Sequence, residues 1–217
     1  MSLISFASAA TILGGSALLT TSYANQLESW LGEGNITITN IYTKQAGHTS
    51  ANFHSAADGQ GRTFSIIEVL GGVNQIIGGY NPRSWDSSSG YVTAYNTNAF
   101  VFNFNTGSVR YHTYTVQPYE SYNYSSYGPT FGNGHDIYVN NSLTGGYTYS
   151  YAYRSNSRTG NLDIPEGYSY GLIASGSGLT IGRIEVFTIS NVPVPEPTTT
   201  VLLGLGVLAL GMLWKRK

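Results

Sequence analysis

The stretch TFSIIEVLGGVNQIIGGY, residues 63–80, has the pattern of two β-strands joined by a tight turn. Apolar and β-branched residues dominate Phe64 to Leu70 and again Val73 to Gly79, and Gly71-Gly72 stands between the two runs. Paired glycines at such a place favour a hairpin, because glycine adopts the positive φ angles that short hairpin turns need. The stretch therefore predicts an antiparallel pair of strands.

Similar short apolar runs lie on both sides of this pair, each bounded by Gly, Asn or Ser. They predict strands at Ile36 to Ile38, Ala99 to Phe104, Val109 to Val116, Ile137 to Val139 and Arg183 to Ile189. Helical spacing of apolar residues predicts two short helices, at Gln26 to Leu31 and at Ser50 to Ala57. Many strands and few helices indicate an all-β (β-rich α+β) fold: a two-sheet antiparallel β-sandwich with a few short flanking helices.

The composition fits one folded domain and excludes several kinds of chemistry. Of the 217 residues, 41% are hydrophobic and 13% aromatic, which is enough to fill a core. The chain has no cysteine, so disulfides, thiolate nucleophiles and cysteine metal sites are excluded. Three of the ten basic residues end the chain and the others are scattered, so no nucleic-acid footprint is expected.

The first 24 residues have the features of a signal peptide. Small and apolar residues run from Leu3 to Leu19, and Ser22-Tyr23-Ala24 offers a small-x-small cleavage site. The usual N-terminal cation is missing, since the first is Lys44. Residues 1–24 are therefore expected to direct export by the Sec machinery, with a buried N-terminal helix as the alternative.

The last residues combine three elements in order. Val194-Pro195-Glu196-Pro197 comes first, an apolar segment from Thr198 to Trp214 follows, and Lys215-Arg216-Lys217 closes the chain. As a transmembrane helix, residues 198–214 would rise about 26 Å. That is a marginal span of a hydrocarbon core about 30 Å thick, with the basic end held on the cytoplasmic side.

This order of elements resembles the PEP-CTERM sorting signal, here residues 191–217. The resemblance implies recognition by an exosortase, transient anchoring in the inner membrane, and release to the cell surface or extracellular matrix. Such tails occur in Gram-negative bacteria that make exopolysaccharide. An ordinary single-pass anchor is the alternative.

One domain is expected between these ends, at residues 25–190, and it contains five short motifs in order. They are Phe53-His54 with Asp58 and Gly61; Gly78-Gly79-Tyr80 with Trp85; Asn98 to Phe102; Gly128 with Phe131, Gly132, Gly134 and Asp136; and Glu185 with Phe187. The ordered set resembles the TLDc domain family. The chain departs from that family at Ala57, Ile77 and Arg183, where the family has Cys, Phe and Glu.

The resemblance implies a two-sheet β-sandwich. Eukaryotic members are linked to oxidative-stress resistance and to contacts with the proton-pumping vacuolar ATPase. A stress-protective role by analogy is therefore one alternative. An exported bacterial protein does not face that pump, so the eukaryotic role does not transfer directly.

The histidines do not show the spacing of a known metal site. His54 and Asp58 stand at i, i+4, and His135 and Asp136 lie in a glycine-rich loop, but neither pair matches a known ligand pattern. We expect His54 to pack or cap at its helix end and His135 to bond within its loop. Glycines of the segment 128–134 should supply positive φ angles, and Asp136 should accept backbone amides. No metal and no cofactor is expected.

No catalytic constellation is visible. The Gly-x-Ser-x-Gly elbow is missing, and Glu68, Asp86, Asp136 and Glu185 are candidates only because they are acidic. Strand alternation predicts that Glu185 lies with Arg183 on an exposed face. We therefore expect a non-enzymatic binding protein, with an extracellular polysaccharide hydrolase as the alternative.

A stripe of tyrosines is the least ordinary feature of the chain. Tyr147, Tyr149, Tyr151 and Tyr153 alternate with small residues, so on a strand all four rings would face one way. Tyrosine is enriched at contact surfaces. The stripe is a candidate surface for exopolysaccharide or a matrix protein. Alternatively, the four rings cover the hydrophobic core or mediate self-association.

Overall fold

The computed structural model describes residues 9–71, 74–88, 90–93, 98–113, 117–158, 162–173 and 176–192. The helices are α1 (Thr21–Leu31), α2 (Ser50–Ala57) and the 3₁₀ turn η1 (Tyr168–Tyr170). The strands are β1 (Thr11–Leu13), β2 (Ile36–Thr43), β3 (Thr63–Leu70), β4 (Gln75–Asn81), β5 (Gly90–Thr93), β6 (Phe100–Asn103), β7 (Ser108–Tyr111), β8 (Tyr119–Asn123), β9 (Ile137–Val139), β10 (Gly145–Thr148) and β11 (Leu179–Asn191).

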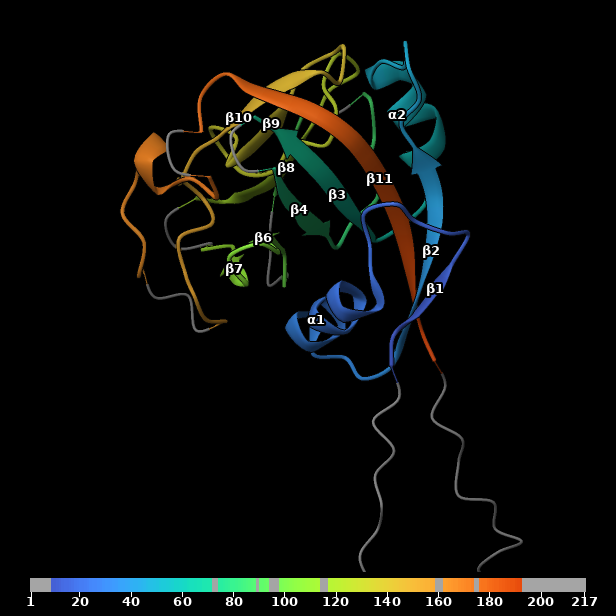
Figure 1. Cartoon of the computed structure of the whole chain (residues 1–217). Coiled ribbons are helices and arrows are strands. Elements are labelled where there is room, and N and C mark those ends of the chain that lie inside the picture. The colour runs from blue at the N-terminus through green and yellow to red at the C-terminus, as the bar shows by residue number, and fades with distance from the viewer. Residues whose placement is uncertain are drawn as a thin grey trace, which may run out of the picture.

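A central mixed sheet organises these elements. In the part of the chain that the structure describes, it has nine strands, seven of them in the order β1-β2-β11-β3-β4-β6-β7 (Figure 1). The long strand β11 also pairs with β10, which in turn pairs with β9, while β5 and β8 form a separate two-stranded sheet. β11 thus connects the main sheet to the layer that lies over it.

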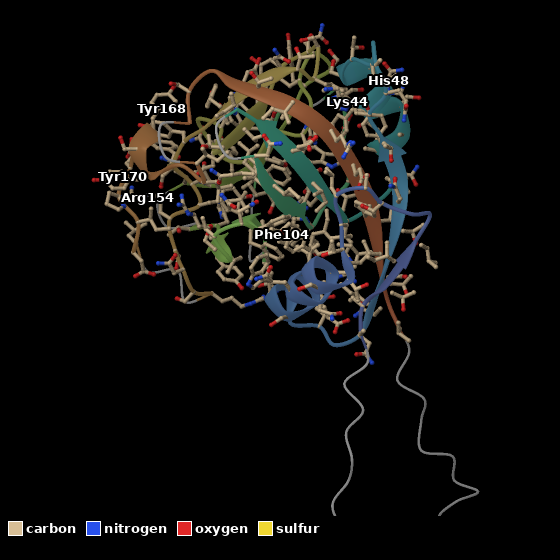
Figure 2. All side chains as sticks on the ribbon, viewed as in Figure 1. Lys44, His48, Phe104, Arg154, Tyr168 and Tyr170 are labelled. Atoms are coloured by element: carbon tan, nitrogen blue, oxygen red, sulfur yellow. The ribbon has the colours of Figure 1, made fainter. Side chains whose placement is uncertain are left out.

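The sheet separates two hydrophobic clusters, because successive side chains of a strand point to opposite faces. In β3, Phe64 and Ile66 belong to one cluster, and Ile67 and Val69 to the other. Helix α1 covers the first cluster, where its Tyr23 stacks on Phe104 with ring centroids 4.1 Å apart (Figure 2).

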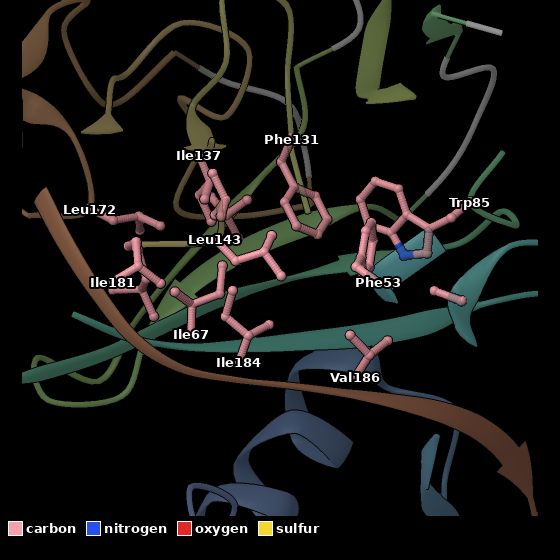
Figure 3. Close-up of a cluster of buried hydrophobic side chains, with 14 of the residues drawn as sticks. Phe53, Ile67, Trp85, Phe131, Ile137, Leu143, Leu172, Ile181, Ile184 and Val186 are labelled. Carbon is pink, nitrogen blue, oxygen red and sulfur yellow. The ribbon is translucent and has the colours of Figure 1, made fainter. Parts of the chain in front are cut away.

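The second cluster lies beneath α2, β9 and the loops that follow them. Figure 3 shows Phe53 of α2, Trp85 and Phe131 packed over Ile184 and Val186 of β11. The two aromatic pairs Phe53–Trp85 and Trp85–Phe131 each have ring centroids 5.4 Å apart in an edge-to-face arrangement, which aromatic pairs prefer. This cluster attaches the covering layer to the sheet.

The expected β-rich fold is confirmed, but the sandwich differs from the one predicted. The main sheet is mixed rather than antiparallel, because β1 pairs parallel with β2. Among the described residues, the opposing layer holds α2, the small β5–β8 sheet, β9, β10 and loops rather than a full second sheet. Helix α2 and strand β9 have the predicted bounds. The predicted strand Val109 to Val116 ends at Tyr111, and residues 114–116 lie outside the described residues.

The N-terminal boundary also differs from the prediction. The predicted signal peptide spans residues 1–24, of which 1–8 lie outside the described residues and 9–24 are part of the domain. Leu18, Leu19 and Ala24 are buried against α1 and the sheet, and Thr20 caps α1. The domain therefore begins before Asn25, since cleavage after Ala24 would remove β1 and the first turn of α1.

Glu185 holds this N-terminal segment in place. The prediction of an exposed Arg183–Glu185 face is confirmed for Arg183 but was wrong for Glu185, whose side chain is 1% exposed. Its carboxylate accepts hydrogen bonds from the amides of Ala17, at 2.8 Å, and Leu18, at 3.4 Å, and from the Ser16 hydroxyl. The segment Ser16 to Leu18 thus covers the face of β11 that strand alternation alone would leave open.

No helix within the described ranges is long and apolar enough to cross a membrane. The predicted transmembrane helix, residues 198–214, and the motif Val194-Pro195-Glu196-Pro197 lie outside those ranges.

Removal of residues 2–24 from the full chain should abolish cooperative unfolding, whereas removal of residues 2–8 should not. The longer deletion exposes the cluster around Leu27 and leaves the buried Glu185 carboxylate without its three donors, and an unsatisfied buried charge is costly. Thermal melts followed by circular dichroism compare the two variants. A normal melt of the longer deletion would contradict the assignment of residues 9–24 to the domain.

Candidate functional site

Tyrosines from several separate segments form one continuous surface, which we call the tyrosine face. They come from β5, β8, β9, β10, η1 and the loops between them, so the face lies on the layer over the second cluster. The tyrosine face consists of Tyr91, Tyr119, Tyr122, Tyr124, Tyr127, Tyr138, Tyr147, Tyr149, Tyr151 and Tyr168, with His135 among them.

Neighbouring rings of the face contact one another. The Tyr127 and Tyr138 centroids are 4.8 Å apart, and those of Tyr138 and Tyr147 are 5.0 Å apart. Tyr168 continues the series at 4.7 Å from Tyr149. All the tyrosines of the face are partly or largely exposed. The face is therefore a pre-arranged array of rings, since each ring is held by its neighbours before any ligand arrives.

The predicted stripe contributes three of its four rings to this face. Tyr147, Tyr149 and Tyr151 are partly exposed, while the residues between them are buried, as alternation predicts. Tyr153 differs, because its ring is fully buried and its hydroxyl donates a hydrogen bond to the Glu120 carbonyl at 2.5 Å. The prediction that all four rings face one way was therefore wrong for Tyr153.

A buried carboxylate explains the change of direction. Asp136 accepts hydrogen bonds from the successive amides of Tyr151, Ala152 and Tyr153, at 2.8–3.1 Å. Successive amides of an extended strand point in opposite directions, so their convergence on one carboxylate requires a bend. The bend turns Tyr153 into the core. The predicted role of Asp136 as an acceptor of backbone amides is confirmed.

Burial raises the pKa of Asp136 to about 6, although the three amides act in the opposite direction.

The glycine-rich loop before Asp136 is shaped by close contacts. Gly132 and Gly134 have φ angles of 84° and 79°, which glycine adopts without strain, so the predicted positive φ is confirmed at these positions. A Cβ on Gly132 would lie 2.1 Å from an Asp136 carboxylate oxygen. Gly128 has a different role, because a Cβ there would lie 2.6 Å from the Leu143 side chain. His135, at φ 66°, places its ring 5.0 Å from Tyr122.

His54 fixes another part of the face. Its Nδ1 lies 2.7 Å from an Asp58 carboxylate oxygen, and its Nε2 lies 3.0 and 3.1 Å from the carbonyl oxygens of Tyr124 and Tyr127. The other Asp58 oxygen accepts the Ser87 amide at 2.9 Å. A hollow of about 450 Å³ adjoins this pair. Both imidazole nitrogens and both carboxylate oxygens already have partners, so the pair anchors the loop rather than offering free chemistry.

Two of the remaining motif residues, Gly78 and Gly79, leave no room for a side chain, one against the neighbouring strand β3 and the other against the covering layer. A Cβ on Gly79 would lie 2.6 Å from the Phe131 ring, and one on Gly78 would lie 2.1 Å from the Ser65 carbonyl oxygen. Trp85 donates its indole N–H to the Thr63 hydroxyl at 2.9 Å. Phe53, Trp85 and Phe131 therefore meet in the second cluster, although they are far apart in the sequence. The motif residues Tyr80, Phe100, Phe102 and Phe187 lie on the other face of the sheet, in the first cluster.

The motifs and the geometry agree with what family comparison finds. Residues 12–190 match the model of the TLDc domain. The chain belongs to the TLDc domain family. The match begins inside β1, so the TLDc domain includes the N-terminal segment that Glu185 holds. A comparison with curated proteins finds no match.

The C-terminal residues 193–217 match the PEP-CTERM protein-sorting motif, which implies an exported protein that is sorted to the cell surface by exosortase. The resemblances that the sequence showed are thus confirmed for both the TLDc domain and the sorting motif.

The four acids considered as candidates for catalysis lie in separate places, and each accepts hydrogen bonds from neighbouring groups. Asp136 and Glu185 are buried and saturated by backbone donors. Glu68 accepts the Arg183 amide at 3.0 Å, and Asp86 bonds to Ser88. Within the described ranges, no group of three or more His, Asp or Glu side chains is placed to hold a metal ion.

A hollow lies within the tyrosine face, and we call it the Glu166 hollow. It has a volume of about 350 Å³ and is lined by Gly134, Tyr149, Tyr151, Glu166 and Tyr168. The Tyr149 hydroxyl lies 3.4 Å from a Glu166 carboxylate oxygen. Desolvation and this carboxylate raise the pKa of Tyr149, so its hydroxyl stays protonated at neutral pH.

Sequence reasoning did not assign Tyr138, Tyr168 or Glu166 to a surface, because they come from separate segments. A signal for part of the face was present in the tyrosine-rich stretch from Tyr119 to Tyr127, which contributes four of its rings.

Asp136→Asn should lower the free energy of unfolding by on the order of 3 kcal/mol, because the amide turns an N–H group towards backbone donors. Asp163→Asn is the control, since Asp163 is exposed and accepts one amide at 3.2 Å; its effect should stay within about 0.5 kcal/mol. Urea denaturation measures both. Equal effects of the two substitutions would contradict the role given to Asp136.

Acid should weaken the domain through His112. Burial lowers the pKa of His112 to about 4, below its value near 6.5 in an unfolded chain. The neutral ring therefore contributes stability above pH 6.5 that is lost as the pH falls towards 4, by up to about 3 kcal/mol. Asp136, with its raised pKa, opposes this loss between pH 6 and its unfolded value.

Comparison with His112→Gln isolates the contribution of His112 to the pH dependence of the free energy of unfolding. The wild type should lose stability relative to the variant as the pH is lowered from 7 to 4, in urea titrations at each pH. A constant difference between the two proteins would contradict the prediction.

Proposed function

We propose that this protein is an exosortase-processed component of the cell surface or extracellular matrix whose TLDc domain binds exopolysaccharide without catalysis. The tyrosine face is the binding surface. The observation that carries the proposal is the continuity of this face: rings from five separate stretches of the chain are exposed together instead of being placed in either core cluster.

The chemistry of tyrosine suits a polysaccharide. Each ring offers an apolar face for the C–H groups of a sugar ring and a hydroxyl for its polar edge. The rings lose little freedom on binding because they already pack on one another, so ordering costs are small. An extended row of such rings matches a repeating polymer better than it matches a single small molecule.

The position of the face supports the same proposal. In Figure 1, β9, β10 and η1 lie at the opposite end of the domain from β1 and the C-terminal end of β11. The sorting motif begins two residues after β11. The tyrosine face therefore lies far from the C-terminal end of β11, where the sorting motif begins, and is accessible to a polymer outside the domain.

A non-enzymatic role is favoured because Asp136 and Glu120, two of the acids near the face, serve as structural acceptors. Asp136 is occupied by three backbone amides and Glu120 pairs with Arg83 at 3.0 Å. These contacts support binding without turnover, and they favour it over the alternative of a polysaccharide hydrolase.

Tyr149→Ala combined with Tyr151→Ala should abolish retention of the protein on the producer's own polysaccharide, because two neighbouring rings of the face are removed together. The control pair, Tyr170→Ala with Leu162→Ala, removes two exposed apolar side chains outside the face. Co-sedimentation with the isolated matrix measures retention. Unchanged retention of the first pair would overturn the proposed function, and release of reducing sugar would favour the hydrolase.

A further inference from the structure

The Glu166 hollow has the features of a binding site for one sugar unit of a longer bound polysaccharide. Its volume of about 350 Å³ is at the lower end of the range for ligand pockets. Tyr149 and Tyr168 form one wall, with centroids 4.7 Å apart and planes at 83°. The Tyr151 ring lies 6.2 Å from that of Tyr149. The hollow thus offers aromatic surfaces in more than one orientation around a small space.

The backbone leaves room at one side of the hollow. Gly134 lines it at a φ angle of 79°, a conformation that favours glycine. A Cβ at this position would lie 3.2 Å from the Tyr151 ring. Any side chain here would press against that ring and reduce the space, so the open wall depends on glycine.

Hydrogen-bonding groups converge on the same space. The Glu166 carboxylate can only accept hydrogen bonds, and the Tyr149 hydroxyl can donate or accept. Glu166 is held by Tyr149 at 3.4 Å and by the Arg154 guanidinium at 3.7 Å. A ligand ring with hydroxyl groups at its edge and C–H groups on its faces can donate hydrogen bonds to Glu166 and pack against the tyrosine rings.

The local charge points to an uncharged ligand. The Arg154 side chain is 16% exposed, and its Nε donates to the Ile164 carbonyl at 2.8 Å, so the guanidinium is fixed behind the carboxylate. Its charge offsets that of Glu166, which weakens attraction for a cation. The carboxylate is the more exposed partner, at 47% against 16% for Arg154, so the accessible charge stays negative and repels a carboxylate or sulfate on a ligand.

We propose that the Glu166 hollow binds an uncharged sugar ring and thereby selects neutral over uronic-acid polysaccharides. This inference rests on the proposed function and names the ligand class of the same face. The sugar ring stacks on Tyr168, its edge contacts Tyr149, whose plane lies at 83° to that of Tyr168, and its hydroxyls donate to the Glu166 carboxylate. The remaining rings of the face then contact adjacent units of the chain.

Tyr168 and Tyr170 provide a matched pair for the test. Both project from η1 at the outer edge of the domain, and both are 47% exposed (Figure 2). Tyr168 lines the Glu166 hollow, whereas Tyr170 lines a separate depression beside Arg110. Removing either ring takes away a similar exposed surface, but only one of the two changes should affect the hollow.

The experiment is affinity electrophoresis of the full chain, in mild detergent, through gels that contain either a neutral glucan or polygalacturonate. The wild type should be retarded by the neutral glucan and less by polygalacturonate. Tyr168→Ala should weaken retardation by the glucan about tenfold, the value of a good aromatic contact, while Tyr170→Ala should leave it unchanged. Glu166→Gln should reduce the preference for the neutral polymer, because the repulsive charge is removed.

Several results would overturn the inference. The variant Tyr91→Ala with Tyr124→Ala removes two exposed rings of the face that do not line the hollow. If this variant loses binding while Tyr168→Ala behaves like Tyr170→Ala, the face binds sugar but the hollow is not the binding site. Stronger binding of polygalacturonate by the wild type would show that the charge argument is wrong. A dimer that forms without polysaccharide and is dissociated by Tyr168→Ala would assign the hollow to a second copy. If the Tyr149/Tyr151 double variant keeps full retention on the native matrix, the proposed function fails together with this inference.

Discussion

The Asp136 carboxylate is the contact on which the tyrosine face depends. It is fully buried, and it draws the amides of Tyr151, Ala152 and Tyr153 towards one point. This convergence ends the extended course of the chain after β10, keeps the Tyr151 ring at the surface and turns the Tyr153 ring inward. A carboxylate in a buried position is unfavourable by itself, so the three donors make the position possible. A Cβ on Gly132 would occupy the space of this carboxylate, so the glycine loop and the acid form one unit.

Local periodicity was sufficient for α2 and β9 because each has a single buried face formed by nearby residues. It was insufficient for residues 9–24. An apolar run with small residues is equally compatible with a signal peptide and with a segment buried in a domain, and composition does not separate them. The distinction depends on Glu185, some 160 residues away along the chain, whose carboxylate receives the amides of Ala17 and Leu18. Such a long-range contact leaves no trace in a local pattern, which is also why Glu185 was expected to be exposed.

The tyrosine face shows the same division between local and distant determinants. Alternation along residues 147–151 correctly predicted that Tyr147, Tyr149 and Tyr151 share one side of the segment, but not that this side is exposed. Tyr153 escaped this rule because of an acid 17 residues earlier in the chain. Tyr138 and Tyr168 join the face only through the pairing of β9 with β10 and the position of η1. The composition of the stretch Tyr119 to Tyr127 was visible, but its place beside β9 was not.

The residues that carry the family resemblance support the fold, whereas those of the tyrosine face form an exposed surface. Phe53, Trp85, Phe131 and Asp136 are all buried. They attach the covering layer to the sheet or hold its loops. The exposed rings stand on segments that these residues fix in place: His54 holds the turn at Tyr124 and Tyr127, and Asp136 holds the segment at Tyr151. The shared residues thus define a scaffold and leave the surface chemistry free to vary. A TLDc domain outside the cell can therefore present a different binding surface on the same framework, without any change to the core that identifies it.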